Sequence, residues 1–206
     1  MHSTMGSRQI GWCLAMVLLL WGCGSQEFES KAALMAYLHD PGNGYHLTEH
    51  VNGVDYALTY RPTDLLVAQE LPDNYKKSTV DSLRNHYGDY LYLNLSMSAG
   101  GQELLSHKAG DRAAFGAMVN QLAFGMGSKI HLVNQVRDTL PLLDYVYPRM
   151  YGMGHSTDLL LVYKKEPRLI ESDFVRLTIA DLGYGTGEIA FKMPTKNFIE
   201  QPELKF

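Results

Sequence analysis

The residues whose types and spacing could do chemistry are concentrated in the string His46-Leu47-Thr48-Glu49-His50. On a helix, two histidines at this spacing lie about one turn apart and can bind one zinc ion, with the glutamate as general base. The flanking sequence predicts a strand instead, and residues four apart on a strand are separated by about 13 Å. Two zinc ligands must each come within about 2.1 Å of the ion. We therefore expect His46 and His50 to be exposed side chains, with a metal site as the less favoured alternative.

Two further strings contain residues used in catalysis or phosphate binding. Gly154-His155-Ser156-Thr157-Asp158 holds Ser, His and Asp together, but it lacks the G-x-S-x-G nucleophile elbow, and triad groups converge from separate elements. Residues 183–187 are glycine-rich, but no predicted helix follows to offer its N-terminus to a phosphate. We expect a loop at the first string, a hairpin turn at the second, and no cofactor or nucleotide site.

The elements that position these residues begin with a hairpin. Asn52-Gly53 is a strong two-residue turn signal, and the stretches 45–51 and 54–61 alternate between apolar and polar residues. A two-residue loop fixes the register, so that Val51 opposes Val54 and His50 opposes Asp55. One face is then the core face, with Glu49 as its exception. The other face carries the remaining side chains, namely His46, Thr48, His50, Asp55, Ala57, Thr59 and Arg61.

The rest of the chain predicts one α+β domain over residues 30–206, with helices mainly in the first half and an antiparallel β-sheet dominating the second half. Helices are predicted from Ser30 to Asp40, over 62–70 and 74–87, and from an N-cap at Asp111. Residues 159–162 are apolar on both faces, which predicts a covered central strand. Strands are predicted over 90–98 and as a meander over 129–136, 139–150, 158–164, 173–181 and 187–193.

Tyrosine is abundant, with 13 residues in the chain. Tyr90 and Tyr92 lie on the polar face of the predicted strand 90–98. Exposed tyrosines favour surfaces that bind glycans or proteins, although the buried rim of a sheet uses tyrosine equally well. The pair is therefore a candidate binding surface.

Charge and cysteine content exclude several classes of function. The formal net charge is −4 and no basic run is present, so nucleic acid is not expected as a partner. The two cysteines are Cys13 and Cys23. Neither lies in the predicted domain, which excludes a thiol nucleophile or a thiolate metal site there.

The N-terminal stretch predicts export. Arg8 precedes an apolar run over residues 10–21, which is shorter than the roughly 20 residues that a transmembrane helix needs. The run ends in Leu20-Trp21-Gly22-Cys23, which resembles the lipobox of bacterial lipoproteins, with Trp21 as its departure. The resemblance implies cleavage between Gly22 and Cys23, removal of residues 1–22, acylation of Cys23 and a tether over 23–29. An ordinary secretory signal and an uncleaved anchor are the alternatives.

The lipobox, the size and the run DPGNG…VNGV…YRPTDLL resemble small lipoproteins of Bacteroidota, a resemblance that implies no activity. Gly24 after the cysteine implies the outer membrane, with the leaflet left open. We expect a membrane-anchored envelope lipoprotein that is non-catalytic and binds a protein partner. One alternative is a glycan- or lipid-binding lipoprotein. The other is a hydrolase that depends on a metal at His46 and His50 or on Ser156.

Overall fold

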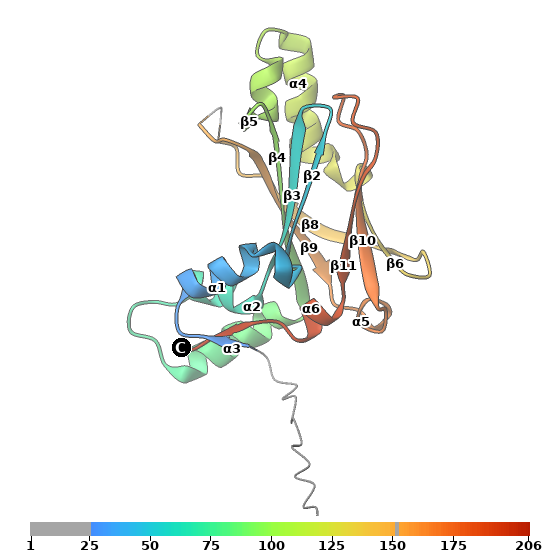
Figure 1. Ribbon diagram of the computed structural model, residues 1–206. Helices are drawn as coiled ribbons and strands as arrows, with labels where there is room; N and C mark the ends of the chain where they lie inside the picture. The colour runs from blue at the N-terminus through green and yellow to red at the C-terminus, as the bar shows by residue number, and fades with distance from the viewer. Residues whose placement is uncertain (1–25, 151–152) are drawn as a thin grey trace, which may run out of the picture.

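The computed structural model describes residues 26–150 and 153–206, so the predicted cleavage site and Cys23 lie outside the described residues. Two antiparallel sheets face one another, and helices gather at one end of them (Figure 1). The predicted α+β class is confirmed, with helices mainly in the first half of the chain. Among the described residues, no helix is long and apolar enough to cross a membrane.

The larger sheet has the strand order β2-β3-β4-β9-β8, and β5 pairs with the end of β4. The predicted hairpin register is confirmed, because Val51 pairs with Val54 and His50 with Asp55. The strands are β2 (His46–Val51), β3 (Val54–Arg61), β4 (Tyr90–Ala99), β5 (Gln102–Glu103), β8 (Leu142–Val146) and β9 (Thr157–Lys164).

The smaller sheet has the order β11-β10-β6-β7, and a separate parallel pair joins β1 to β12. The prediction of one meander after residue 129 is wrong, since β8 and β9 join the larger sheet while the other strands form the smaller one. These strands are β6 (Ile130–Asn134), β7 (Thr139–Leu140), β10 (Phe174–Ile179) and β11 (Ile189–Pro194), with β1 (Glu27–Phe28) and β12 (Glu203–Leu204).

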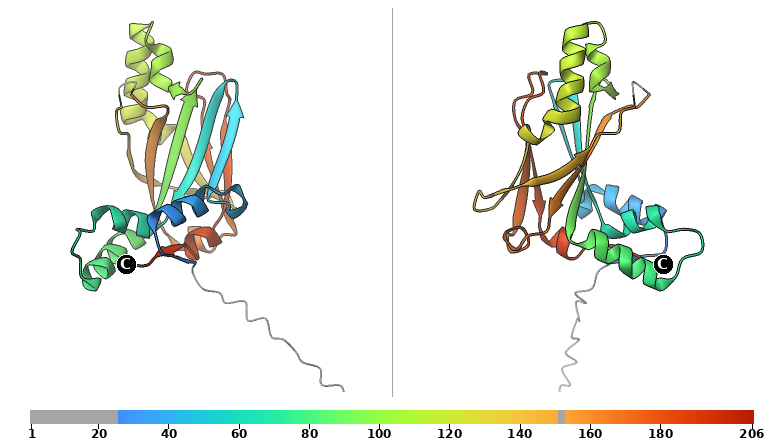
Figure 2. Two further views of the ribbon diagram at one scale, coloured as in Figure 1. Left: turned by 60° about the vertical axis from the view of Figure 1, so that its left-hand side comes forward. Right: turned by 180° about the vertical axis from the view of Figure 1, so that it is seen from behind.

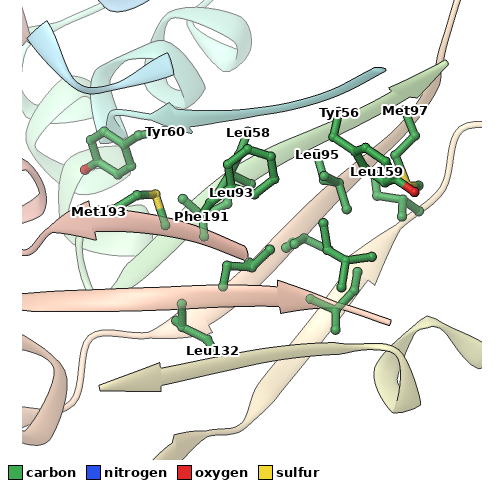
Figure 3. Close-up of a cluster of buried hydrophobic side chains, with 14 of the residues drawn as sticks. Tyr56, Leu58, Tyr60, Leu93, Leu95, Met97, Leu132, Leu159, Phe191 and Met193 are labelled. Carbon is green, nitrogen blue, oxygen red and sulfur yellow. The ribbon is translucent and has the colours of Figure 1, made fainter. Parts of the chain in front are cut away.

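The core lies between the two sheets. Alternate residues of each strand point inward, so Leu58, Leu93 and Leu95 of the larger sheet meet Leu132 and Phe191 of the smaller one (Figure 3). Residues 159–162 are covered on one face only: their odd-numbered members are fully buried, whereas the even-numbered ones are half-buried on the outer face of the larger sheet.

Three helices and a short fourth surround the end of the molecule at which the described chain begins (Figures 1 and 2). The first helix starts next to Ser30 as predicted, and the Ser30 side chain caps it by accepting a hydrogen bond from the N–H of Ala33. The third helix begins at Lys77 rather than at residue 74. These helices are α1 (Lys31–His39), α2 (Thr63–Glu70), α3 (Lys77–Gly88) and α6 (Lys196–Ile199).

Another helical segment lies at the opposite end of the sheets (Figure 1). Asp111 caps its first helix as predicted, accepting hydrogen bonds from the N–H groups of Ala113 and Ala114. Met118 and Leu122 of its predicted apolar stripe are buried, whereas Phe115 is 37% exposed. The segment comprises the 3-10 turn η2 (Leu104–Lys108), α4 (Arg112–Asn120), the π-helical turn η3 (Gln121–Gly125) and η4 (Met126–Ser128). The remaining turns are η1 (Pro41–Asn43) and the unpredicted α5 (Pro167–Ile170).

Candidate functional site

The two histidines of the H-x-x-E-H string lie on the outer face of the larger sheet, and each contacts a different neighbour. His50 Nδ1 lies 2.6 Å from Oδ1 of Asp55, and His46 Nδ1 lies 2.8 Å from Oγ1 of Thr59. Glu49 is on the opposite face of the strand, across from Tyr56. The string therefore does not converge, and no group of three His, Cys, Asp or Glu side chains in the described part of the chain could hold a metal ion.

The glycine string forms a loop, whereas the serine string comprises the bend 154–156 and the first two residues of β9. Ser156 Oγ donates to Oδ2 of Asp158 at 3.0 Å, while His155 is exposed and hydrogen-bonds to neither within the described structure. The glycine-rich residues 183–187 connect β10 to β11, and the carboxylate of Asp181 accepts backbone hydrogen bonds from this loop. Those hydrogen bonds, the one from Tyr184 foremost, hold the pKa of Asp181 below its usual value. Both strings thus have structural roles in turns.

The tyrosine pair is covered rather than open. Tyr92 is 8% exposed, and its ring lies 6.0 Å from that of Tyr87 on α3. Tyr90 is half-buried and packs 6.3 Å from Tyr92. Helix α3 and its neighbours therefore occupy the surface on which this pair was expected to bind a ligand.

The outer face of the larger sheet is open between α1 and the β2–β3 turn (Figure 2, left). Three neighbouring strands supply its side chains, and the strand register aligns them in rows across the sheet. Polar side chains predominate there: His46, Thr48 and His50 from β2, Asp55, Thr59 and Arg61 from β3, and Asn94, Ser96 and Ser98 from β4.

A cavity of about 270 Å³ lies where α1 and α2 meet this outer face. We call it the Arg61 pocket. Arg61 is the last residue of β3, and Pro62 ends the strand and opens α2, so the guanidinium lies at the corner between sheet and helices. The lining residues come from four elements: Lys31, Met35, Leu38 and His39 of α1, Thr59, Tyr60 and Arg61 of β3, Leu65 and Gln69 of α2, and Asn94 of β4.

The Arg61 pocket is positively charged, because Lys31 and Arg61 line it and no acidic residue does. Arg61 is half-buried, and no hydrogen bond or ion pair joins its guanidinium to any residue that the structure describes. Burial lowers the pKa of Arg61 below its usual value, since removing water disfavours the charged form. Among the described residues, the Arg61 guanidinium therefore has no counter-charge.

One histidine, His39, lines the same cavity, and His46 lies next to it. The His39 Nδ1 donates to the carbonyl oxygen of Met35 at 2.8 Å, and its ring centre lies 5.0 Å from that of His46. Burial, followed by the nearby His39, lowers the pKa of His46. His46 contacts the hydroxyl of Thr59, but its other neighbour is a histidine rather than the carboxylate that orients the base of a catalytic triad. The arrangement is suited to binding an anion more than to activating a nucleophile.

A second cavity, of about 340 Å³, lies at the opposite end of the molecule. We call it the α4 groove. Its wall is mainly apolar, with Phe115 and Val119 from α4 and Arg149 as its charged residue. The remaining lining residues are Leu105, Ser106, Ala109 and Tyr147. This groove explains the exposure of Phe115, which faces a cavity and not the core.

The sequence predicted the outer face of the sheet that forms one wall of the Arg61 pocket, but not the pocket itself. The hairpin register places Arg61 on the same outer face as His46 and Thr59, which the alternation of residues predicts. Lys31 and His39 come from a helix whose position over that face is set by long-range packing. No local sequence motif predicts the position of this helix.

Comparisons with known proteins add no functional information. No protein-family model matches the chain, and no curated protein matches it. A solved structure of a novel protein of unknown function from Burkholderia pseudomallei aligns with a TM-score of 0.43 at 9% identity, covering 81% of this chain and 84% of that one.

Proposed function

We propose that this chain is a lipid-anchored protein of the bacterial cell envelope that binds a ligand through an oxyanion held in the Arg61 pocket, without transforming it. The observation that supports this function is the half-buried guanidinium of Arg61, which has no partner among the described residues. A structural arginine in such a position is normally paired, as Arg84 is with Asp64.

The energetics favour an anionic ligand. A partly buried cation loses hydration without gaining a counter-charge. A carboxylate, sulfate or phosphate supplies that counter-charge. The planar guanidinium binds such groups with two parallel hydrogen bonds, and a hydrogen bond to a charged group contributes about 1.5–3 kcal/mol. Lys31 adds a second positive charge, and the side-chain amides of Gln69 and Asn94 can donate further hydrogen bonds.

The proposed anchor would bring this pocket near a membrane. The lipobox resemblance supports acylation of Cys23, and Gln26, the first described residue, follows Cys23 closely in the sequence. Two or three acyl chains hold a protein stably on a bilayer. The described chain begins at the end of the molecule that carries α1 (Figure 1). Because α1 lines the Arg61 pocket, an acylated Cys23 would hold this pocket close to the bilayer. Gly24 supports the outer membrane as the location.

A second function, binding of an envelope protein, is favoured by the α4 groove. Its position at the end away from the anchor leaves it accessible to a partner, and apolar pockets of this kind accept the anchor side chains of protein interfaces. Arg149 makes no ion pair with a described residue, so the fitting segment is apolar with one acidic residue facing Arg149.

Isothermal titration calorimetry on the acylated protein in detergent tests the first function. Sulfate, phosphate and acetate are the probes, and we expect a Kd of about 1 mM or tighter, which is about −4 kcal/mol, for at least one of them. Arg61→Gln should weaken this binding about tenfold or more, which is about 1.4 kcal/mol. Arg176→Gln is the matched control, because Arg176 is an outward-facing arginine on β10. Equal binding by both variants would refute the assignment.

A further inference from the structure

The open face beyond the Arg61 pocket presents polar side chains that make no hydrogen bond to other described residues. Asn94, Ser96 and Ser98 are alternate residues along the outer side of β4, and Thr48 of β2 lies in the same row as Ser96, with Ala57 of β3 between them. In the described structure, no hydrogen bond joins the side chain of any of these four residues to another residue. Their hydroxyl and amide groups are therefore available to a ligand.

We call the row of Asn94, Ser96 and Ser98, together with Thr48, the strip. A further cavity lies along it on the same face of the sheet. It measures about 310 Å³ and is lined by outward residues that include Thr48, His50, Ser96 and Ser98. Asn94 of the Arg61 pocket and Ser96 of this cavity are successive outward positions on β4. Since successive outward residues lie about 6.8 Å apart, the strip from Arg61 to the far end of β3 is about 20 Å long.

Charge changes along the strip. The Arg61 end is cationic, whereas the far end carries Asp55, which is paired with His50. A uniformly anionic polymer would meet the Asp55 carboxylate at that end. A ligand with one acidic group, neutral over the rest of its length, is complementary to both ends.

The chemistry of the strip fits hydroxyl groups. Serine and threonine hydroxyls donate and accept hydrogen bonds, and the amide of Asn94 does both with separate atoms. An acyl chain would leave these groups unpaired, which costs free energy. Leu160, the neighbour of Asn94 on β9, supplies a half-buried apolar edge for the less polar face of a sugar ring.

We infer that the ligand is an oligosaccharide with an acidic unit at one end. This inference rests on the proposed function: the acidic group binds at Arg61, and neutral sugar units extend along Asn94, Ser96 and Ser98 toward the β2–β3 turn. The strip selects for length and hydroxyl content, and the pocket selects for charge.

The test compares four ligands by calorimetry on the acylated protein in detergent. The probes are glucuronate, a neutral tetrasaccharide, the same tetrasaccharide ending in one glucuronate unit, and glycerol phosphate, which is the soluble head group of an anionic lipid. We expect the acidic tetrasaccharide to bind at least tenfold more tightly than glucuronate, and the neutral one to bind more weakly than the acidic one. Ser96→Leu should remove the gain from length and leave glucuronate binding unchanged, because Ser96 lines the strip and not the Arg61 pocket. Thr178→Leu, on the outer face of β10, is the matched control and should change neither.

The outcomes separate the two proposals. Equal affinity for glucuronate and the acidic tetrasaccharide would overturn the oligosaccharide inference while leaving the Arg61 function in place. Tighter binding of glycerol phosphate than of either acidic sugar would also overturn it, in favour of a lipid head group. Absence of binding by every anionic probe would overturn the proposed function itself. The length comparison uses the unsubstituted protein, so it stands even if a variant fails to fold.

Discussion

Arg84 donates two hydrogen bonds to the carboxylate of Asp64, from Nε at 2.8 Å and from Nη2 at 2.6 Å. Asp64 is 3% exposed and also accepts a hydrogen bond from the backbone N–H of Leu204 at 2.7 Å. One carboxylate thus joins α2, α3 and β12. Arg61, nearby in the sequence, has no such acid within the described part of the chain, and this contrast separates an arginine that stabilises the fold from one that is available to a ligand.

Asp64→Asn should destabilise the fold by about 3 kcal/mol, because it removes the charge that pairs with Arg84 and disturbs the hydrogen bond to Leu204. Glu166→Gln, which breaks the more exposed pair with Arg168, is the comparison and should cost less than about 1 kcal/mol. Urea unfolding followed by circular dichroism measures both. Similar losses in the two variants would contradict the structural role of Asp64.

Two buried tyrosines should respond in opposite directions to loss of the hydroxyl. The Tyr163 hydroxyl is buried without a hydrogen-bond partner among the described residues, so Tyr163→Phe should be neutral or stabilising by up to about 1 kcal/mol. The Tyr60 hydroxyl donates to Oε1 of Gln201 at 2.7 Å, so Tyr60→Phe should cost about 1 kcal/mol. Thermal unfolding measures the difference, and a larger loss for Tyr163→Phe would be inconsistent with this packing.

Stability should depend on pH through His46. Because burial lowers the pKa of His46 in the fold, the unfolded chain binds its proton more readily. The contribution of His46 is therefore fully present above about pH 6.5, the pKa of an unperturbed histidine, and is lost as the pH falls through the lower folded value. His46→Gln should remove this part of the dependence between about pH 5 and 7. Unfolding free energies measured across that range, in variant and parent, provide the check, and parallel curves would contradict it.

An anion in the Arg61 pocket should favour the protonated form of His46, which burial disfavours in the free protein. A nearby negative charge favours the protonated imidazole, so binding should take up a fraction of a proton near pH 6. Calorimetry in two buffers with different ionisation enthalpies measures the uptake. We expect His46→Gln to reduce the uptake while retaining binding through Arg61; uptake of the same size in the variant would place the proton elsewhere.

Phe115 and Met118 lie on the same helix, but their truncation should affect stability differently. Phe115→Ala should change stability by less than about 1 kcal/mol because Phe115 lines an open cavity, whereas Met118→Ala should cost about 2 kcal/mol or more. If the groove binds a protein, a photo-crosslinking residue at position 115 should give one discrete adduct in cells, and Arg149→Glu should abolish it. An adduct that persists in Arg149→Glu would exclude the acidic, apolar segment that we propose.

The anchor is tested separately by Cys23→Ala. Without the acylated cysteine the protein should move from the membrane fraction to the soluble fraction, because the acyl chains are its proposed attachment. Fractionation in high salt is the measurement, since salt removes electrostatic attachment. A variant that stays with the membranes would contradict the lipobox interpretation.

The sequence predicted the local structure well where one short signal decides it. Asn52-Gly53 set the register of β2 and β3, and Asp111 capped α4 as expected. The division into two sheets was not predictable, because β4 pairs with β9 across a long separation, as Ser96 does with Asp158. The same holds for the Arg61 pocket, which exists only once α1 has packed beside the sheet.

The measurement that tests the proposed function most directly is NMR of the arginine Nε–H groups during titration with sulfate. Arg61→Gln assigns the signal of Arg61, and Arg176 supplies a reference signal from an exposed strand position. The Arg61 signal should shift in a saturable way while the Arg176 signal changes little. If the Arg61 signal does not move, or moves no more than that of Arg176 at every concentration, the Arg61 pocket does not bind the oxyanion and the proposed function is wrong.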